Sequence, residues 1–487
     1  MTSLYRIILA GALVFLLGLA SSAQAEQQAL FESGKGNVSV PASITSPSYI
    51  NSVPHPVSAS KPHRKYHKDP FVPDPAELAK LQVEKYDATN PHHILDRAAT
   101  LDKATNLFEP CQSFSGISST GWNPPDPNVA VGPDHIVAVV NSSIAIYDKA
   151  TGAQLLQSTA EFWFQNTTPP PPSYFIFDPK VVYDPKAEHF IIFFLCTNDI
   201  DKSSFLVSAS ESSDAMGNWF SYNLNATLNG DTPTSTWPDY PGLGFDYDEA
   251  VYLTANIWQF DGGYLYPKVR ILDKDSLYSG GEIIWNDIWN LRYNNFSTAF
   301  TVKPAETYSD ADGEFLLSNI WYGATYTTYW KITDPLGTPV ATLRPQVNVA
   351  TYSSPPDATQ LGGLPNLSLV GPMTQEVVYR NGMVYTSFSQ SFNWGSQTVA
   401  AVRMLGIDTV SSQAAFDAVY GADGVHYYFP AIYVDPSDRI HAVFSRSSTE
   451  EYISVHYVED FLNDPASKLL KAGESHRGGG SPTRWGD

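Results

Sequence analysis

The chain has 487 residues, which is enough for one large domain or for two or three of ordinary size. It is 43% hydrophobic and 16% charged, which excludes wholesale disorder because there is ample apolar material for a core. The 50 Asp and Glu residues outnumber the 29 Lys and Arg residues, giving a formal net charge of -21. A surface of that sign repels phosphate backbones, so we expect no nucleic-acid partner.

The chain begins with the pattern of a secretory signal peptide. Arg6 precedes an apolar run over residues 7–20, and residues 23–25 form an Ala-x-Ala cleavage site. No stretch reaches the roughly 18 uninterrupted apolar residues that a spanning helix needs. We therefore predict a signal peptide over residues 1–25 and a secreted or periplasmic monomer without a membrane span.

Residues 26–110 precede the main domain and differ from it in composition and in the spacing of apolar residues. Residues 26–73 are rich in Ser and Pro without sustained periodicity, which predicts a flexible leader. Residues 74–110 carry apolar residues at helical spacing, which predicts a short helical segment. Histidines such as His92 and His93 gather in these segments, and solvent-exposed side chains explain them better than a metal-binding tail does.

The only two cysteines are Cys111 and Cys196. An oxidising compartment favours their pairing, so one hypothesis is a disulfide that joins the entry segment to the domain. Two buried thiols are the alternative. Neither cysteine has histidines at metal spacing beside it, which argues against a zinc site.

From about residue 121, apolar runs of four to eight residues alternate with turn clusters, and this alternation predicts an all-β domain. Similar phrases of strand, polar turn and strand begin at steps of 52 to 68 residues, and weaker strand-like runs follow each of them. Four strands per unit at such a period indicate a β-propeller of six recognisable blades over residues 111–475. The phrases begin near Asp126, Asp178, Asp239, Pro304, Pro372 and Pro430.

Five phrases of the chain are informative: "DPNVAVGPDHIVAVVNSSIAIYDKATG" from Asp126, "SSDAMGNWFSYNL" from Ser212, "WPDYPGLGFDYDEAVYLTAN" from Trp237, "VVYRNG" from Val377 and the terminal "RWGD". They resemble a family of secreted bacterial β-propeller proteins of the sialidase and Asp-box-like superfamily, whose activity is not established. The resemblance covers about residues 121–487 and implies fold and export, but no catalytic residues. It also implies seven blades in the complete family, so that residues 476–487 are the truncated start of a further blade.

The segment from Ser210 to Trp219 is similar to an Asp-box, which in such folds is a turn between strands and lies far from the active site. A sialidase would also need an arginine cluster to bind a carboxylate. No motif surrounds the arginines that could be proposed for it, which are Arg270, Arg292, Arg344, Arg380 and Arg403.

Carboxylates recur near the starts or first turns of the blades. A pair of them in the central channel could act as acid and base or nucleophile, but repetition across blades favours a structural role. These residues are Asp126, Asp178, Asp239 and Asp435.

Aromatic residues near blade starts and turns are candidate ligand-binding residues because their faces stack on sugar rings. Packing between blades is the alternative. They are Trp237, Tyr240, Trp258, Trp321 and Trp394.

Asp310 and Asp312 alternate before Gly313 and form part of a calcium loop. An Asp-Gly hairpin turn explains the same residues without a metal. Calcium is thus one hypothesis and no cofactor is the other.

Taken together, the sequence predicts an exported binding or scaffold module for a glycan or an extracellular protein. The alternative is a carbohydrate-active enzyme, a glycoside hydrolase or polysaccharide lyase, with its site in the central channel. An asymmetric pair of carboxylates in the channel would favour the enzyme, and a flat aromatic rim would favour binding.

Overall fold

The computed structural model describes residues 30–38, 40–53, 55, 92–96, 113–173, 175–363, 366–477 and 483–486. The predicted signal peptide and Cys111 lie outside these ranges. Almost all regular structure within them is β, which confirms the all-β prediction. In these ranges no helix is long and apolar enough to cross a membrane. The helices are α2 (Pro47–Ser52), α4 (Ala160–Phe164) and α5 (Lys274–Ser279).

Antiparallel strands follow one another along the chain in groups, which we number units 1 to 6. Unit 1 contains β4 (Asn128–Val131), β5 (His135–Val140), β6 (Ser143–Asp148) and β7 (Gln154–Thr159). Unit 2 contains β8 (Ile176–Asp184), β9 (His189–Thr197), β10 (Ser203–Ser210) and β11 (Trp219–Asn225). Unit 3 contains β14 (Thr236–Phe245), β15 (Ala250–Gln259), β16 (Tyr264–Asp273) and β17 (Ile283–Trp289).

The second half of the chain continues in the same way. Unit 4 contains β18 (Lys303–Thr307), β19 (Glu314–Ser318), β20 (Gly323–Thr333), β21 (Val340–Leu343) and β22 (Val347–Ser353). Unit 5 contains β24 (Val377–Arg380), β25 (Met383–Asn393), β26 (Thr398–Asp408) and β27 (Gln413–Gly421). Unit 6 contains β28 (His426–Val434), β29 (Ile440–Ser448), β30 (Glu451–Val458) and β31 (Lys468–Lys471). Short pairs are formed by β12 (Leu228–Asn229) with β13 (Thr232–Pro233) and by β23 (Leu367–Ser368) with β32 (Thr483–Arg484).

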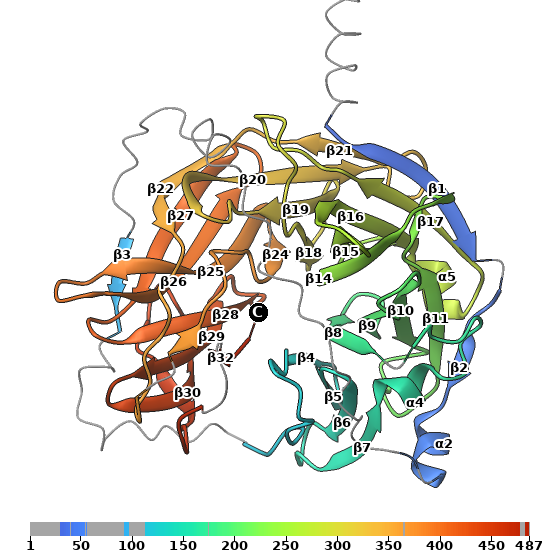
Figure 1. Ribbon diagram of the computed structural model, residues 1–487, viewed down its shortest axis with the longest axis horizontal. Helices are drawn as coiled ribbons and strands as arrows, with labels where there is room; N and C mark the ends of the chain where they lie inside the picture. The colour runs from blue at the N-terminus through green and yellow to red at the C-terminus, as the bar shows by residue number, and fades with distance from the viewer. Residues whose placement is uncertain are drawn as a thin grey trace, which may run out of the picture.

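The units are arranged around a common centre, with the first strand of each unit nearest to it (Figure 1). Units 3, 4 and 5 share one sheet because β14, β18 and β24 pair in parallel. Gly244 makes the first of these pairings possible, since a Cβ there would lie 2.3 Å from the carbonyl oxygen of Ala305. No strand pairing joins unit 1 to unit 6 within the described ranges, so these sheets form no closed ring of hydrogen bonds.

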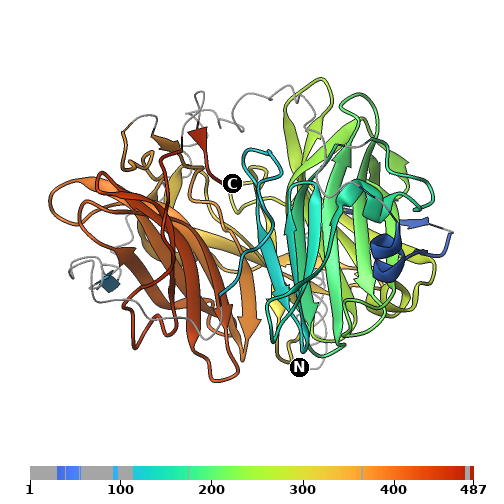
Figure 2. The same ribbon diagram turned by 90° about the horizontal axis from the view of Figure 1, so that it is seen from below.

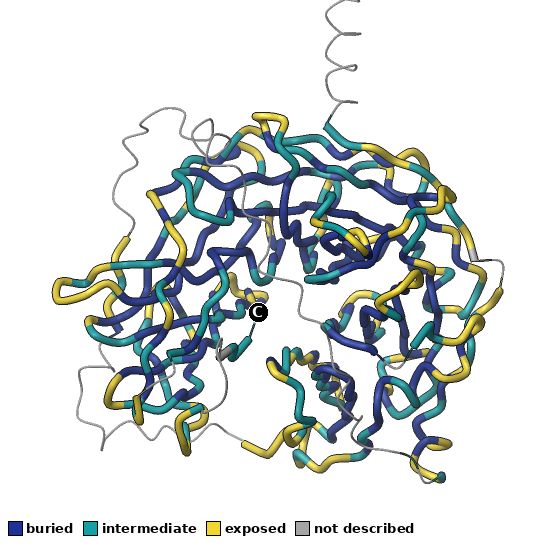
Figure 3. Tube along the Cα trace, in the orientation of Figure 1, coloured by how far each residue is buried: buried dark blue, intermediate teal, exposed yellow. Residues whose placement is uncertain are grey.

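Apolar side chains of adjacent units pack against each other and form the core. Between units 1 and 2, for example, Ile146 contributes to the same buried cluster as Phe190 and Ile192. Figure 3 shows buried residues along the strands of each unit and exposed residues at the outer turns. Units 2 and 3 are covered on both faces, and β9 and β15 are accordingly buried along almost their whole length. In units 1 and 6, strands such as β5 and β29 alternate between buried and partly exposed residues.

The repeated phrase forms a β-bulge at the start of a first strand. Asp126, Asp178, Tyr240 and Phe429 each precede a proline and each have a left-handed backbone, with φ between 47° and 51°. Such angles are rare for residues other than glycine. In units 2, 3 and 6 the strand register shifts at this point, so the X-Pro pair is the extra segment of a bulge.

Hydrogen bonds from the preceding unit hold the bulges of units 2 and 6 in place, and also the residues just before β18 of unit 4. The backbone N–H of Asp178 donates to Asn141 Oδ1 of unit 1 at 2.6 Å. The N–H of Thr301, just before unit 4, donates to Asn256 Oδ1 of unit 3 at 2.8 Å. The N–H of Phe429 donates to Ser389 Oγ of unit 5 at 3.0 Å. At units 2 and 6 the repeated phrase therefore marks the point where the first strand docks on the preceding unit.

The second aspartate of the phrase has a separate role in the turn that follows. Asp435 Oδ1 accepts the backbone N–H groups of Ser437 and Arg439 at 2.8 and 3.0 Å. Asp184 and Asp246 accept backbone N–H groups in the equivalent turns of units 2 and 3. These aspartates stabilise turns, as expected for Asx motifs.

The prediction of a flexible leader over residues 26–73 is wrong for its described part. There, β1 (Glu32–Val38) pairs with β17 and β2 (Ser43–Thr45) pairs with β11. Asn51, at the end of α2, donates to the carbonyl of Leu155 in β7 at 3.0 Å. Outer strands leave backbone groups unpaired, and these segments satisfy them without needing an apolar pattern of their own.

The prediction of a helical segment over residues 74–110 is also wrong for its described part, residues 92–96. His92–Leu95 form strand β3, which pairs in parallel with β27 of unit 5. Residues 30–38, 40–53, 55 and 92–96 together make what we name the outer belt. Figure 2 shows its parts on opposite flanks of the ring, with α2 beside units 1 and 2 and β3 beside unit 5.

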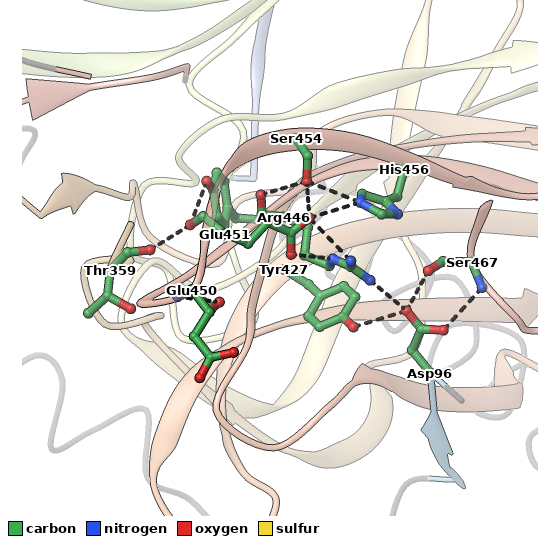
Figure 4. A network of polar contacts seen from close by, with 12 residues as sticks. Asp96, Thr359, Tyr427, Arg446, Glu450, Glu451, Ser454, His456 and Ser467 are labelled. Carbon is green, nitrogen blue, oxygen red and sulfur yellow. Dashed lines mark hydrogen bonds and ion pairs between the residues drawn. The ribbon is translucent and has the colours of Figure 1, made fainter. Parts of the chain in front are cut away.

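Asp96 ends the belt in a buried polar network of unit 6 (Figure 4). Its carboxylate accepts from Tyr427 Oη at 3.0 Å and from Ser467 Oγ at 2.5 Å. Arg446 lies 3.4 Å away and makes a second ion pair with Glu451 at 2.9 Å. The belt therefore connects residues more than 300 positions apart in the chain.

Two further predictions concern unit 2. The Asp-box-like segment is a turn between β10 and β11, in which Asp214 Oδ1 accepts the N–H of Met216 at 2.9 Å. Trp219 is buried behind it. Cys196 is a buried thiol that donates to the carbonyl of Ser173 at 3.4 Å, and burial raises its pKa to about 12. Pairing with Cys111 stays a prediction.

Candidate functional site: the central cavity

A cavity of about 300 Å³ lies where the first strands converge, and we name it the central cavity. Its wall combines the X-Pro bulges with residues just before β24 and with the C-terminal segment. Apolar lining includes Tyr240, Met373, Phe429, Phe444 and Trp485, and polar lining includes Asp126, Asp178, Lys180, Lys303, Gln375 and Glu376.

A second, much smaller cavity of about 20 Å³ adjoins the central cavity. The two share Lys180, Lys303, Gln375 and Glu376 as lining residues, while Glu306 lines only the smaller one. The charged residues therefore gather at the junction of the two cavities, and they come from units 2 and 4 and from the segment before unit 5.

Glu306, on β18, carries a proton at neutral pH. Burial, and secondly the charge of Glu376, raise its pKa to about 8. The Tyr308 hydroxyl donates to Glu306 Oε2 at 2.5 Å and fixes the orientation of this carboxyl. Glu306 can therefore donate a proton at pH values where an ordinary glutamate is ionised.

Glu376 is held from the opposite side of the ring. Asn128, the first residue of β4, donates from Nδ2 to Glu376 Oε1 at 3.2 Å. The Oδ1 atom of the same Asn128 accepts the N–H of Val181 in β8 at 2.8 Å. One amide side chain thus links unit 1 to unit 2 and to the segment before unit 5.

Lys303 is buried at the start of β18. Its Nζ donates to the carbonyl of Pro241 at 2.5 Å, and the carbonyl of Tyr240 lies at 3.4 Å. Burial, and secondly the charge of Lys180, lower its pKa to about 7. In the described ranges, no side-chain hydrogen bond or ion pair within 4.0 Å joins Lys180 to another residue. This site therefore contains a strongly perturbed acid and a strongly perturbed base in one cavity, which is typical of a functional site.

The predicted aromatic residues separate into two groups. Tyr240 lines the central cavity. Trp237 and Trp258 are only 3% and 8% exposed and belong to the core cluster of units 2 and 3, so neither offers a face to a sugar. Trp321 packs edge-to-face on Phe300, and Trp394 lies beside β3 with its ring 6.1 Å from that of His93. Most of the predicted aromatic residues therefore pack between elements of the fold, which was the alternative to ligand binding.

The five arginines of the sialidase hypothesis do not converge on the cavity, and none of them lines it. Arg270 makes a bidentate ion pair with Asp287, and Arg403 makes the equivalent pair with Asp417. The other three donate to backbone carbonyls: Arg292 to Phe296, Arg344 to Thr409 and Arg380 to Val434.

The calcium hypothesis gains no support from the geometry. Asp312 pairs with Lys331, and Asp310 is exposed. Among the described residues, no group of three or more His, Cys, Asp and Glu side chains is arranged to bind a metal ion. Calcium binding stays an untested prediction.

Sequence reasoning found two of the acidic lining residues, Asp126 and Asp178, and missed the charged residues at the junction. Lys180, Lys303, Glu306 and Glu376 all stand within or beside the repeated phrases. Their signal is a lack of repetition: Lys180 follows the X-Pro pair of unit 2, where unit 6 has Ala431. Charged residues at one unit and apolar residues at the equivalent place in another are the asymmetry that a site requires.

No protein-family model and no curated protein sequence matches this chain. Among solved structures, a Hadza microbial sialidase matches with a TM-score of 0.41 and 11% identity over 71% of this chain. The match spans 65% of the length of that sialidase. An endo-arabinanase from Bacillus licheniformis matches with a TM-score of 0.28 and 12% identity, over 71% of this chain and 91% of its own. An exo-1,5-alpha-L-arabinanase from a bovine ruminal metagenomic library matches with a TM-score of 0.32 and 8% identity, over 71% and 96%.

Proposed function

We propose that the protein is an exported β-propeller of six blades that binds a saccharide in its central cavity. The observation that supports this proposal is the mixed wall of the cavity. Lys180, Gln375 and Lys303 supply donors, Asp126, Asp178 and Glu376 supply acceptors, and Tyr240, Phe429 and Trp485 supply aromatic carbon. A sugar offers hydroxyl groups of both kinds and an apolar ring face, so it is complementary to such a wall.

The charges of the cavity favour a neutral sugar over an acidic one. Three carboxylates line the central cavity, against two lysines, one of which has a pKa lowered to about 7. An added ligand carboxylate would be repelled by this set, whereas hydroxyl groups can donate to it. The ligand class that we propose is therefore a neutral mono- or oligosaccharide.

The test is calorimetric titration of the full mature chain with neutral and uronate-containing oligosaccharides. We expect Tyr240→Asn to weaken binding of a neutral ligand about tenfold, because it removes the ring while Asn tolerates the left-handed backbone. Trp394→Ala is the matched control, since that aromatic residue lies beside β3 and outside the cavity. Equal losses in both variants, or tighter binding of uronates, would overturn the proposal.

A second candidate, glycoside hydrolysis, is favoured by one specific observation. Glu306 has a pKa raised to about 8 beside the second carboxylate of Glu376, and this asymmetry suits a general acid paired with a base. Hydrolysis predicts release of reducing ends that both Glu306→Gln and Glu376→Gln abolish. Glu161→Gln is the control, because burial also raises the pKa of Glu161, which lies on α4 away from the cavity. If the protein without substitutions releases no reducing ends from any neutral polysaccharide that it binds, hydrolysis is excluded and binding is the function.

A further inference from the structure

Lys303 combines three properties that rarely coincide in one lysine. It is 7% exposed, it lines both cavities, and its Nζ is directed by two backbone carbonyls of the unit 3 bulge. A neutral amine has two N–H groups and one lone pair. When both N–H groups point to Pro241 and Tyr240, the lone pair is left for a partner in the cavity.

Charged groups of several units act on Lys303. Lys180 and Asp178 approach from unit 2, Asp239 from unit 3, and Glu376 from the segment before unit 5. Glu306 follows on the same strand and faces Lys180 and Glu376. A desolvated amine beside a second cation is a recurring way of keeping a lysine nucleophilic at neutral pH.

We propose that Lys303 is a nucleophilic amine that forms an imine with the carbonyl group of an open-chain hydroxylated aldehyde bound in the central cavity. The proposal rests on the saccharide-binding function proposed above and narrows its ligand to one with a free reducing end. Only a reducing sugar presents an aldehyde, through its open-chain form.

The bond changes balance without any oxidant or reductant. The Nζ lone pair of Lys303 forms a bond to the carbonyl carbon. The carbonyl π pair moves to oxygen, which lies at the junction with the smaller cavity and there takes the proton of Glu306. The added nitrogen gives a proton to the Glu376 carboxylate, producing a neutral carbinolamine. Its hydroxyl group then takes that proton back from Glu376 and leaves as water, while the nitrogen lone pair forms the C=N bond. The product is a protonated imine, whose positive charge is balanced by the Glu306 carboxylate. Water reverses the same steps and releases the ligand.

Lys268 provides a control within the same molecule. It is fully buried, and burial lowers its pKa to about 7 as well. Its Nζ donates to the carbonyls of Ala226 and Leu228 at 3.0 and 2.7 Å, as Lys303 does to its own pair. Lys268 lines neither the central cavity nor the smaller one beside it. Lys268 and Lys303 are therefore matched in burial and in the direction of their pKa shift, and they differ in access to a ligand.

The experiment is brief reductive trapping of the full mature chain with glyceraldehyde and sodium cyanoborohydride at pH 7, followed by peptide mass spectrometry. We expect Lys303 to be modified at least about tenfold faster than Lys268 and than exposed lysines, which are almost fully protonated at that pH. The rate at Lys303 should rise with a midpoint near pH 7, and Lys180→Met should shift that midpoint upward by removing the neighbouring cation.

Three outcomes separate the two proposals. Preferential modification of Lys303 that a bound non-reducing neutral oligosaccharide blocks supports both of them. Preferential modification that such an oligosaccharide does not block supports the reactive amine and overturns saccharide binding. Modification of Lys303 no faster than that of Lys268, in protein that binds a saccharide, overturns the reactive amine alone. Because the labelled lysine is identified in the protein without substitutions, the result does not depend on whether a variant folds.

Discussion

Buried charged side chains occur in two regions of this molecule, and the regions differ in whether each charge has a partner of opposite sign. Between the outer strands of units 3 and 5, each buried arginine has a bidentate carboxylate partner: Arg270 with Asp287 and Arg403 with Asp417. Both arginines also reach a backbone carbonyl of the preceding unit, Asn225 and Ala350 respectively. These pairs occupy equivalent strands of their units and leave little hydrogen-bonding capacity unused.

At the centre of the ring, the charges are close but unmatched. In the described part of the chain, no ion pair within 4.0 Å joins Lys180 or Lys303 to Glu306 or Glu376. Burial raises the pKa of Glu306 to about 8 and lowers the pKa of Lys303 to about 7. Paired charges hold units together, whereas unmatched charges cost stability and persist where a ligand or a reaction needs them.

Breaking an outer pair should have the largest effect. Arg403→Met leaves the Asp417 carboxylate partly buried without its partner, which we expect to lower the free energy of unfolding by about 3–5 kcal/mol. Urea unfolding followed by tryptophan fluorescence measures this loss. Lys303→Met is the comparison at the centre, and at pH 6 it should stabilise the protein, because the native site disfavours a charged lysine. Equal losses in the two variants would remove the distinction between the regions.

The outer belt is attached to unit 6 through the carboxylate of Asp96, which has partners as the carboxylates of Asp287 and Asp417 do. Asp96→Ala removes the acceptor of Tyr427, Ser467 and Arg446, and we expect a loss of about 2 kcal/mol. Limited proteolysis should then cleave the belt before the ring unfolds. Asp310→Ala, at an exposed carboxylate, is the control and should change neither stability nor cleavage. If Asp96→Ala left the belt as resistant as in the unmodified protein, β3 would not depend on this network.

Acid should weaken the same network through Glu451. Although burial opposes it, hydrogen bonds from His456, Ser454 and Arg446 and the charge of Arg446 lower the pKa of Glu451 to about 2. The stabilisation is present above the unfolded pKa of about 4.5 and is lost as the pH falls towards 2. Glu451→Gln should therefore be less stable than the unmodified protein at pH 7 and equally stable near pH 2. A stability difference that stayed constant from pH 7 to pH 2 would contradict this.

The centre should respond to pH in the opposite sense and to a smaller extent. Native Glu306 keeps its proton up to about pH 8, while the unfolded chain releases it near pH 4.5. The native state thus binds more protons over this interval, and this group lowers the free energy of unfolding as the pH rises. Glu306→Gln should leave stability unchanged at pH 5 and raise it at pH 9. Thermal unfolding at the two pH values checks the sign.

How far the sequence could predict the structure depended on the kind of interaction. The turn aspartates and the strand pairs were predictable, because Asp184 and Asp435 act on backbone groups within five residues. The belt was not, because β1, β2 and β3 are edge strands held by backbone hydrogen bonds to distant strands. These strands carry no apolar alternation, so composition favoured a flexible leader and apolar spacing favoured a helix.

The candidate site shows the same limit. Asp126 and Asp178 were found because they repeat, whereas Lys303, Glu306 and Glu376 were missed because each occurs in only one unit. Local sequence determined the all-β fold, the turns and the X-Pro bulges, since each of these depends on neighbours a few residues away. Only the tertiary structure decided which charges meet at the centre, which arginines are paired and where the belt is attached. Those contacts join residues tens to hundreds of positions apart, and their energies depend on burial, which no local pattern specifies.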